Sequence, residues 1–510
     1  MTEPKSPTAG AWVGASSVGT LFAQRARIEG EKIALVQDDR TRTFAELNER
    51  ANRLAHVLLA NGITRGDRVA LLARNCIEYV EVELACGKIG AITACQNWRL
   101  ADAELQHCLT LVEPSLIISA PDYLVTLARL DLPKMPVIAI GEDYEARLAD
   151  SATSEPENAV DGEDGFVILY TSGTTGMPKG ALISHRAMIA RSLCIAGEMD
   201  LPRDDCFIAW APYFHMASTD QGTASLLRGT PVVIVDGYDP AAIIRTLEQR
   251  RVGWLLLIPG MIEDFVQALR AAKPEIKGVS MCGAMADLVP PHQLAAVTEL
   301  LDAPYVNTFG ATETGLPPAT GSLIPVGVAP TDLAKRQSGF CEIRLVDEHD
   351  NEVGIDEPGE VAVRGPTIFS GYWRAPETNA KDFRNGWFHM GDVMARRPDG
   401  LLTFKDRVKY MIKSGGENIY PAEIERVLMA DARVDDVAVV RKQDDRWGEI
   451  PVAAVAINAD VTSEDLLNAC RQELAGYKQP KEIRFVDYND LPRSTSGKIQ
   501  RHEVEKWFVE

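Results

Sequence analysis

Long apolar runs are missing from this sequence. No stretch approaches the roughly 20 apolar residues that a membrane-spanning helix needs. Residues 1–16 also lack the apolar core of a secretory signal, and we interpret them as a loose tail. Membrane and secreted locations are therefore disfavoured, and we expect a cytoplasmic protein.

The sequence also lacks paired cysteines and an excess of positive charge. Its nine cysteines are odd in number and none stands in a Cys-x-x-Cys pair, which disfavours a disulfide framework or a zinc site. The 53 Lys and Arg against 73 Asp and Glu give a net charge of −20, which disfavours nucleic acid as a partner. A nucleotide is not excluded, because salt screens charges beyond about 8–10 Å and local groups can hold phosphate.

The remaining pattern is that of a multidomain α/β protein. A chain of 510 residues is too long for one ordinary core. Residues 43–61 predict an amphipathic helix with Thr43 as its N-cap. Strand, helix and strand follow one another over 69–94 and again over 232–258, which is typical of parallel crossovers. Strands within 361–394 favour an all-β subdomain.

One polar stretch, residues 170–180, stands out after the apolar run 166–169. We interpret it as a loop between a strand and a helix over 186–196, in which glycine amides, hydroxyls and Lys179 suit a polyphosphate. A Walker A loop is excluded, because Pro178 precedes the lysine and Gly180 follows it. The alternative is a flexible connector. The candidate phosphate-binding residues are Thr171, Ser172, Gly173, Thr174, Thr175, Gly176 and Lys179.

This stretch resembles the phosphate-loop signature of the adenylate-forming superfamily, which includes acyl-CoA synthetases, adenylation domains of peptide synthetases, and luciferases. The resemblance covers nearly the whole chain, with the motifs in family order. It implies a large N-terminal domain of parallel α/β layers with a β subdomain over residues 17–406. A hinge over 407–409 and a small mobile α+β C-terminal domain over 410–510 would follow.

A second motif, residues 307–314, resembles the family's Tyr-Gly-x-Thr-Glu, with Phe309 in place of the tyrosine. The resemblance implies that Glu313 ligates magnesium as a hard oxygen donor and that Thr312 binds a phosphate oxygen. The same resemblance places adenine against this motif and against Gly283 and Ala284. The adenine candidates are Thr308, Phe309, Gly310 and Ala311 together with Gly283 and Ala284.

Two further segments complete the implied nucleotide site. Residues 387–392 resemble the family's Trp-Phe-x-Thr-Gly-Asp, which makes Asp392 the expected partner of the ribose hydroxyls. Arg407 would reach the ribose or a phosphate. The chain departs from the family at Cys282, Met285 and Met390. We expect the departures at Cys282 and Met285 to affect the shape of the pocket and to leave nucleotide binding in place.

The C-terminal part carries the implied machinery for two half-reactions. Lys409 would be the pivot of the hinge, and Lys498 would bridge the carboxylate and the α-phosphate in the first step. In the second step, rotation of the small domain would replace Lys498 by a Gly-rich loop. That loop and a nearby segment contribute Ser414, Gly415, Gly416 and Trp447.

The acid pocket is expected near His215, which the family places between the nucleotide and the acyl group. A lone histidine beside aromatic residues is otherwise usually structural. The other expected pocket residues are Ser218, Thr219, Gly222, Cys282, Gly283 and Gly310. They are mostly small and none is basic, so a sizeable or ring-containing acid fits and a second carboxylate is disfavoured. Medium-chain, aryl, alicyclic and steroid-derived acids all stay open.

The resemblance implies ATP-dependent ligation of a carboxylic acid to coenzyme A through an acyl-adenylate, with Mg²⁺ as cofactor and release of AMP and pyrophosphate. A stand-alone adenylation enzyme that loads a carrier protein is the main alternative, although no carrier domain is visible after Glu510. A luciferase-like oxygenase and a non-enzymatic binding protein are less favoured. A homodimer is an assembly that the family allows and that nothing in this sequence supports.

Overall fold

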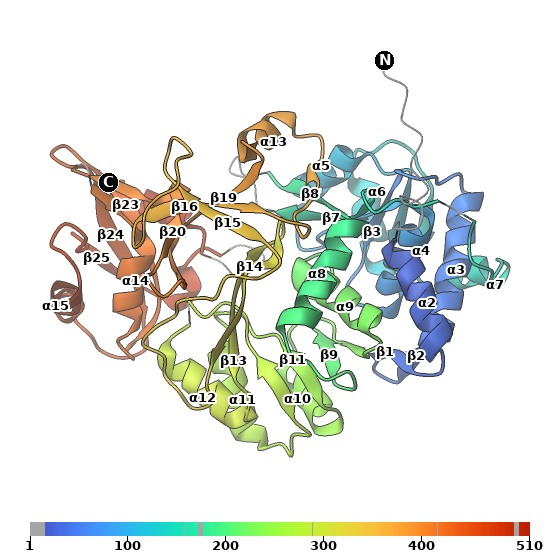
Figure 1. Ribbon diagram of the computed structural model, residues 1–510, viewed down its shortest axis with the longest axis horizontal. Helices are drawn as coiled ribbons and strands as arrows, with labels where there is room; N and C mark the ends of the chain where they lie inside the picture. Colours follow the sequence, from blue (N-terminus) through green and yellow to red (C-terminus); the bar gives the residue numbers. More distant parts are fainter. Residues whose placement is uncertain are drawn as a thin grey trace.

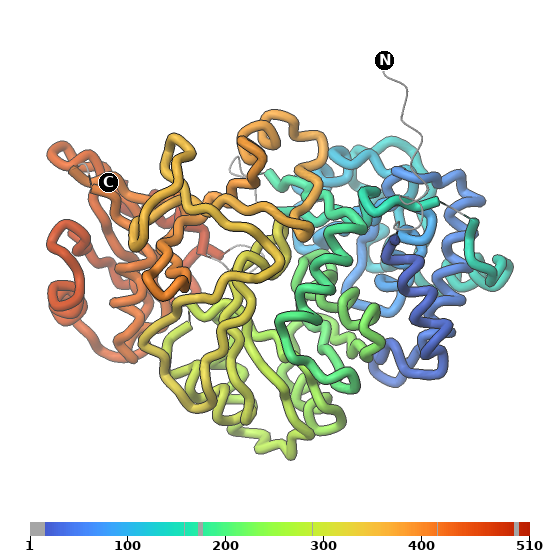
Figure 2. The backbone as a smooth tube through the Cα atoms, viewed as in Figure 1, coloured from blue at the N-terminus to red at the C-terminus, as the bar shows by residue number. Residues whose placement is uncertain are grey.

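The computed structural model describes residues 16–157, 159–171, 177–287, 289–415, 417–493 and 499–509. The chain runs from N-terminal helices at one end of the molecule to a C-terminal unit at the other end (Figures 1 and 2). Within the described residues, no helix is both long and apolar enough to span a membrane.

The first layer is an eight-stranded sheet built mostly from the middle of the chain. Its inner strands are parallel, and the hairpins at its two edges are antiparallel. The predicted parallel unit over 232–258 is present, but its two strands flank β9 rather than each other. In spatial order the strands are β14 (Gly315–Ile324), β13 (Tyr305–Ala311), β12 (Val279–Cys282), β11 (Val252–Leu255), β9 (Cys206–Ala209), β10 (Val232–Ile234), β1 (Ile33–Gln37) and β2 (Arg40–Thr43).

The second layer is a seven-stranded sheet that contains the predicted crossover over 69–94, whose two strands pair in parallel as expected. Its strands are β17 (Gly371–Tyr372), β8 (Lys179–Ser184), β7 (Gly165–Thr171), β4 (Ile92–Cys95), β3 (Arg68–Leu72), β5 (Leu116–Ser119) and β6 (Val137–Ala139).

Helices fill the space between these two sheets. Helix α4 contacts β1 of the first sheet and β3, β4 and β7 of the second, and α8 contacts β14 and both β7 and β8. Every residue of α4 is buried, so its charged side chains need partners: Glu81 accepts from Arg50, and Lys88 donates to Glu155 at 2.6 Å. The helices of this part are α2 (Val18–Glu29), α3 (Phe44–Ala60), α4 (Ile77–Ile89), α5 (Asp102–Val112), α6 (Leu124–Arg129), α7 (Glu142–Ala149), α8 (His185–Glu198), α9 (Met216–Arg228), α10 (Pro240–Gln249), α11 (Ile262–Ala272) and α12 (Pro291–Leu301).

A third, five-stranded sheet forms the expected all-β subdomain and carries one short helix, α13 (Pro376–Asp382). Its neighbouring strands are all antiparallel. They are β15 (Glu342–Val346), β16 (Pro358–Arg364), β18 (Phe383–Arg384), β19 (Trp387–Arg396) and β20 (Leu402–Arg407).

The C-terminal unit has its own sheet and its own hydrophobic clusters, between residues 412 and 508. Its elements are β21 (Ile412–Ser414), β22 (Glu417–Ile419), β23 (Val434–Asp444), β24 (Gly448–Ile457), β25 (Ile483–Val486), α14 (Pro421–Met429), α15 (Ser463–Glu473) and α16 (Arg501–Glu505). The α/β fold class with a β subdomain and a smaller α+β unit is therefore confirmed.

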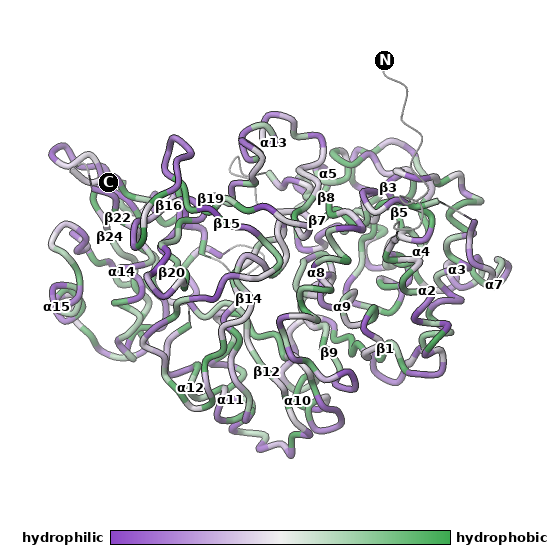
Figure 3. The backbone as a smooth tube through the Cα atoms, in the orientation of Figure 1, coloured by the Kyte–Doolittle hydropathy of each residue, from purple (hydrophilic) through white to green (hydrophobic). Residues whose placement is uncertain are grey.

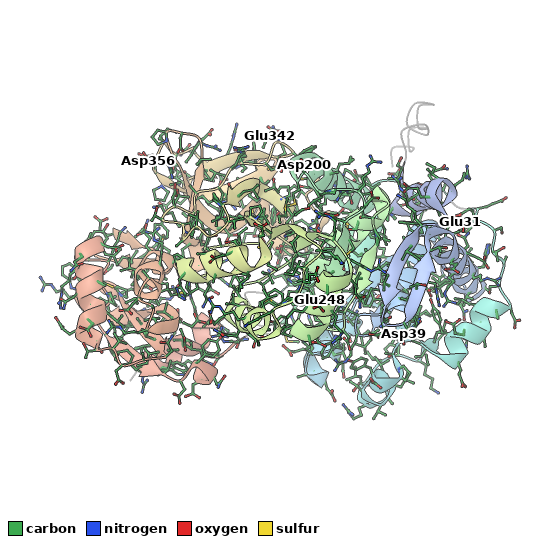
Figure 4. The ribbon with its side chains drawn as sticks, turned by 90° about the horizontal axis from the view of Figure 1, so that it is seen from below. Glu31, Asp39, Asp200, Glu248, Glu342 and Asp356 are labelled. Atoms are coloured by element: carbon green, nitrogen blue, oxygen red, sulfur yellow. The ribbon has the colours of Figure 1, made fainter. Side chains whose placement is uncertain are left out.

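Apolar residues make up most of the buried core, and polar residues lie mostly outside it. Hydrophilic stretches gather at loop tips around the rim of the molecule (Figure 3). The acidic surplus is spread over many elements: the six acidic residues labelled in Figure 4, Glu31, Asp39, Asp200, Glu248, Glu342 and Asp356, are all exposed. The nine cysteines are free thiols, and all except the half-buried Cys76 are buried.

Two predicted loops have a different form in the structure. The phosphate-loop stretch joins two antiparallel strands, β7 and β8, and helix α8 begins only after β8. The interpretation as a strand–loop–helix unit was therefore wrong in this detail, because residues 179–184 pair with β7. The Gly-rich stretch near 415 likewise joins a hairpin of β21 and β22 before helix α14.

Candidate active site

The ends of the phosphate-loop stretch are held together by the β7–β8 ladder. Thr171 pairs with Lys179 across the two strands. Ser172, Gly173, Thr174, Thr175 and Gly176 lie outside the described residues. The Lys179 ammonium lies 5.1 Å from the centre of the Tyr372 ring, which directs this cation toward the segment that contacts Glu313.

Glu313 is fixed by groups from a distant part of the chain. The Tyr372 hydroxyl donates to Glu313 Oε1 at 2.7 Å, and the Phe369 amide donates to the Glu313 carbonyl at 2.8 Å. The second carboxylate oxygen, Oε2, has no hydrogen-bond partner among the residues described. A half-buried carboxylate with one oxygen available fits a magnesium ion, which prefers one or two carboxylates plus phosphate oxygens.

Asp392 and Arg407 form an ion pair between neighbouring strands of the β subdomain. They face each other across β19 and β20, and Arg407 Nε donates to Asp392 Oδ1 at 2.9 Å. The Asp392 carboxylate raises the pKa of the guanidinium, and Glu313 adds to this effect. The sequence predicted both residues for one site, and the structure brings them together.

The expected adenine residues come from adjacent strand ends. The Thr308 amide donates to the Ala284 carbonyl at 3.1 Å, so the segments at 283–284 and 308–311 lie side by side. The Phe309 ring lies 5.3 Å from the Phe404 ring, centre to centre. Thr314 Oγ1 accepts from the Ala311 amide at 3.0 Å, which orders the turn that carries Thr312 and Glu313.

His215 is the N-cap of helix α9. Its Nδ1 accepts from the Ala217 amide at 3.2 Å, so the neutral ring carries its hydrogen on Nε2. The neighbouring hydroxyls bind backbone: Ser218 donates to the Ala211 carbonyl at 2.5 Å, and Thr219 donates to the Tyr213 carbonyl. Their hydroxyl groups therefore donate to backbone carbonyls at the start of α9.

At three positions expected in the pocket, the packing of neighbouring atoms leaves no room for a side chain larger than that of glycine. A Cβ at Gly222 would lie 3.1 Å from the Tyr213 hydroxyl. A Cβ at Gly283 would overlap the Tyr305 ring, and one at Gly310 would overlap the Gly315 carbonyl. The protein itself fills these positions. The inference that small residues here make room for a large acid was therefore wrong for these three.

The expected second-step residues form a separate group in the C-terminal unit. Ser414 pairs with Gly448, and the Gly415 amide donates to the Trp447 carbonyl at 2.8 Å. In the part of the chain that the structure describes, no hydrogen bond or ion pair joins this group to Glu313. Lys409 is exposed, with its ammonium 4.7 Å from the Tyr410 ring. Gly416 and Lys498 lie outside the described residues.

Sequence reasoning missed two residues that shape this site. Tyr372 binds Glu313 from 59 positions away, and no local signal marks it. Asn75, at the start of the turn into α4, donates from Nδ2 to the carbonyls of Ala209, Ala211 and Val235 at 2.8–3.2 Å and accepts from the Tyr213 amide at 2.9 Å. It thus ties the end of β3 to the loop that leads to His215.

Known proteins share this architecture and its motifs. A family described as AMP-binding enzyme matches residues 22–373, and the AMP-binding enzyme C-terminal domain matches residues 423–498. The feruloyl-CoA synthase of Amycolatopsis sp is 35% identical over 96% of this chain and 99% of its own. The indoleacetate–CoA ligase of Aromatoleum aromaticum is 32% identical over 95% and 96%.

A solved structure matches at the level of the fold as well. The o-succinylbenzoate CoA synthetase from Bacillus subtilis, in complex with its acyl-adenylate intermediate, has a TM-score of 0.81 at 25% identity. The match covers 95% of this chain and 97% of that one. The similarity therefore includes both the large part and the C-terminal unit.

Proposed function

The chain belongs to the AMP-binding enzyme family, and we propose that this AMP-forming acyl-CoA ligase activates a carboxylic acid that carries an aromatic ring. The observation that carries the proposal is the similarity of this chain, over 95–96% of its length, to three relatives described above. The names of the three relatives described above all contain aromatic acids.

The reaction proceeds in two steps. A carboxylate oxygen of the acid attacks the α-phosphorus of ATP, a new P–O bond forms, and the bond to the bridging oxygen breaks to release pyrophosphate. The sulfur of coenzyme A then attacks the acyl carbon, a C–S bond forms, and AMP leaves with the electrons of the broken C–O bond. Two anions must meet in the first step, so positioning and charge neutralisation supply the catalysis.

We infer that the residues divide this work as follows. Glu313 would hold magnesium, which when bound would neutralise phosphate charge, while Lys179 and the stretch 171–179 would bind the β- and γ-phosphates. Asp392 accepts hydrogen bonds from the ribose hydroxyls, and Arg407 holds Asp392 in place. His215 borders the acyl group at the start of α9. Lys498 bridges the carboxylate and the α-phosphate, and Lys409 is the pivot for the second step.

The test is a pyrophosphate-release assay with ATP and Mg²⁺ on a panel of acids, each with and without coenzyme A. The panel contains a hydroxycinnamic acid, an arylacetic acid, benzoic acid, octanoic acid and palmitic acid. We expect kcat/KM for the best aryl acid to exceed that for octanoic acid by about 10-fold or more, because a pocket that fits one shape loses about 1–3 kcal/mol per misfitted group.

Other outcomes would change the conclusion. Faster turnover of octanoic or palmitic acid would overturn the aromatic proposal and indicate a fatty acyl-CoA ligase. Pyrophosphate release that coenzyme A does not accelerate, with no thioester formed, would favour a carrier protein as the thiol acceptor.

A further inference from the structure

Arg191 is one of the largest fully buried side chains described, at 1% exposure, and the reaction as derived above does not use it. It projects from helix α8 and donates three hydrogen bonds of 3.0 Å to three separate segments: Nη1 to Asp220, Nε to the Thr367 carbonyl and Nη2 to the Thr312 carbonyl. A planar guanidinium donates from three separate nitrogens in fixed directions, whereas the three donors of an ammonium share one nitrogen and rotate together.

The two carbonyls belong to two different segments, one that carries Glu313 and one that contacts it. Thr312 is the residue before Glu313, and the segment that begins at Thr367 leads to Tyr372, whose hydroxyl binds the Glu313 carboxylate. Arg191 therefore fixes the spacing between the backbone that carries Glu313 and the strand that orients it. Its stem also packs against Gly315, where a Cβ would lie 2.8 Å from Arg191 Cγ.

Asp220 balances the charge of this arginine. It lies on α9, the helix that His215 caps, and its side chain is 2% exposed. Burial raises the pKa of Asp220, and the neighbouring Arg191 opposes this rise. The pair therefore links the helix at the acid pocket to the Glu313 segment through buried contacts, where an unpaired group costs far more than at the surface.

We propose that Arg191 is a positioning residue for adenylate formation: it holds the Thr312–Glu313 segment so that the Glu313 carboxylate meets magnesium in one geometry. The inference rests on the magnesium role proposed for Glu313. It assigns Arg191 no contact with substrate.

The test compares Arg191→Lys with Arg50→Lys in the full-length enzyme, using the best acid from the panel. Arg50 is the matched control, because it is a mostly buried arginine whose ion-pair partners, Glu81 on α4 and Glu145 on α7, are not partners of Arg191. The measurements are the Mg²⁺ concentration for half-maximal pyrophosphate release, kcat, and the thermal midpoint. We expect Arg191→Lys to raise the Mg²⁺ midpoint about 10-fold and to lower kcat about 10- to 100-fold, since a shift of about 1 Å at a catalytic group costs rates of this order.

Arg50→Lys should lower the thermal midpoint and leave the Mg²⁺ midpoint unchanged. Equal Mg²⁺ midpoints for Arg191→Lys and the wild type would overturn the proposal. If Arg191→Lys does not fold, the double variant Arg191→Gln/Asp220→Asn removes both buried charges together, and it must show the same Mg²⁺ shift.

Glu313→Gln distinguishes a failure of the magnesium role proposed for Glu313 from a failure of the positioning role proposed for Arg191. If it leaves the Mg²⁺ midpoint unchanged, the role of Glu313 itself fails. If it shifts the midpoint and both Arg191 variants do not, only the positioning role of Arg191 fails.

Discussion

The two acidic residues of the site, Glu313 and Asp392, are held by different kinds of donor. Glu313 accepts from the neutral Tyr372 hydroxyl, so its full negative charge stays available to a cation. Asp392 accepts from the Arg407 guanidinium, so its charge is largely balanced. The difference in donors therefore suits the Glu313 carboxylate to a metal ion and the Asp392 carboxylate to a sugar.

His185 makes stability sensitive to acid. It is fully buried, its Nδ1 accepts from the Val18 amide at 3.1 Å, and burial lowers its pKa to about 4 from 6.5. Between the two pKa values, the His185 side chain is protonated in the unfolded chain and neutral in the folded protein. The free energy of unfolding therefore falls as the pH falls. Between pH 7 and pH 5 the loss from this residue is about 2 kcal/mol.

Denaturant unfolding of the wild type and of His185→Gln at both pH values measures this effect. The glutamine can accept from the Val18 amide but cannot take up a proton, so the variant should lose less stability on acidification. The same loss in both proteins would contradict the buried neutral state of His185.

At the scale of elements, Asn75 joins parts of the two large sheets. Its four hydrogen bonds connect the end of β3 with the ends of β9 and β10 and with the loop before α9. Asn75→Ala removes four buried hydrogen bonds and leaves the Tyr213 amide without its partner, while each of the three carbonyls keeps another donor. We expect a loss of about 2–4 kcal/mol in the free energy of unfolding.

Asn61→Ala is the matched control for that prediction. The Asn61 side chain makes one hydrogen bond, to the Val57 carbonyl at the end of α3, and its loss should cost about 1 kcal/mol or less. Equal losses in the two variants, measured by denaturant unfolding, would show that Asn75 does not hold the sheets together.

Local elements were largely predictable from the sequence. Thr43 caps α3 with a capping box that includes Glu46, and the alternation of strand and helix over 69–94 gave the correct parallel pairing. The hairpins at 171–179 and 414–417 were not anticipated, because glycine-rich turns look alike between two strands and between a strand and a helix. Which partner a strand finds depends on the rest of the sheet.

The site was predictable only where motifs mark it. Glu313, Asp392 and Arg407 were found through resemblance, and the structure brings the last two into contact. Tyr372 and Arg191 were missed because their partners lie 59 and 121 positions away, respectively, and single residues at such distances leave no periodic signal. Gly222, Gly283 and Gly310 were misinterpreted as open space, because the sequence does not show whether neighbouring protein atoms occupy the place of the missing side chain.

At the scale of the whole molecule, the C-terminal unit contacts the β subdomain around Asp406. Its carboxylate accepts from the Ala422 amide at 2.8 Å, near the start of α14, and from Arg501 at 3.2 Å, while Lys405 pairs with Glu423 at 3.2 Å. A rotation about Lys409 would separate these groups, because Asp406 precedes the pivot and its partners follow it.

Lys409→Pro tests that rotation. Proline fixes φ near −65°, so the variant should still release pyrophosphate in the first step while thioester formation falls by about 100-fold or more. Lys409→Ala removes the charge but leaves the backbone free, and it should retain both steps. Full turnover by Lys409→Pro, measured as thioester formed per ATP consumed, would exclude this residue as the pivot.

The buried cysteines bear on what happens to the activated acid. Burial raises the pKa of all nine thiols, including Cys282 next to Gly283, so none is a thiolate at neutral pH. An acyl-adenylate reacts with any thiolate that reaches it. Because these thiols are neutral and all except Cys76 are buried, we expect the protein not to acylate itself, so that the activated acyl group persists until the thiol of coenzyme A arrives.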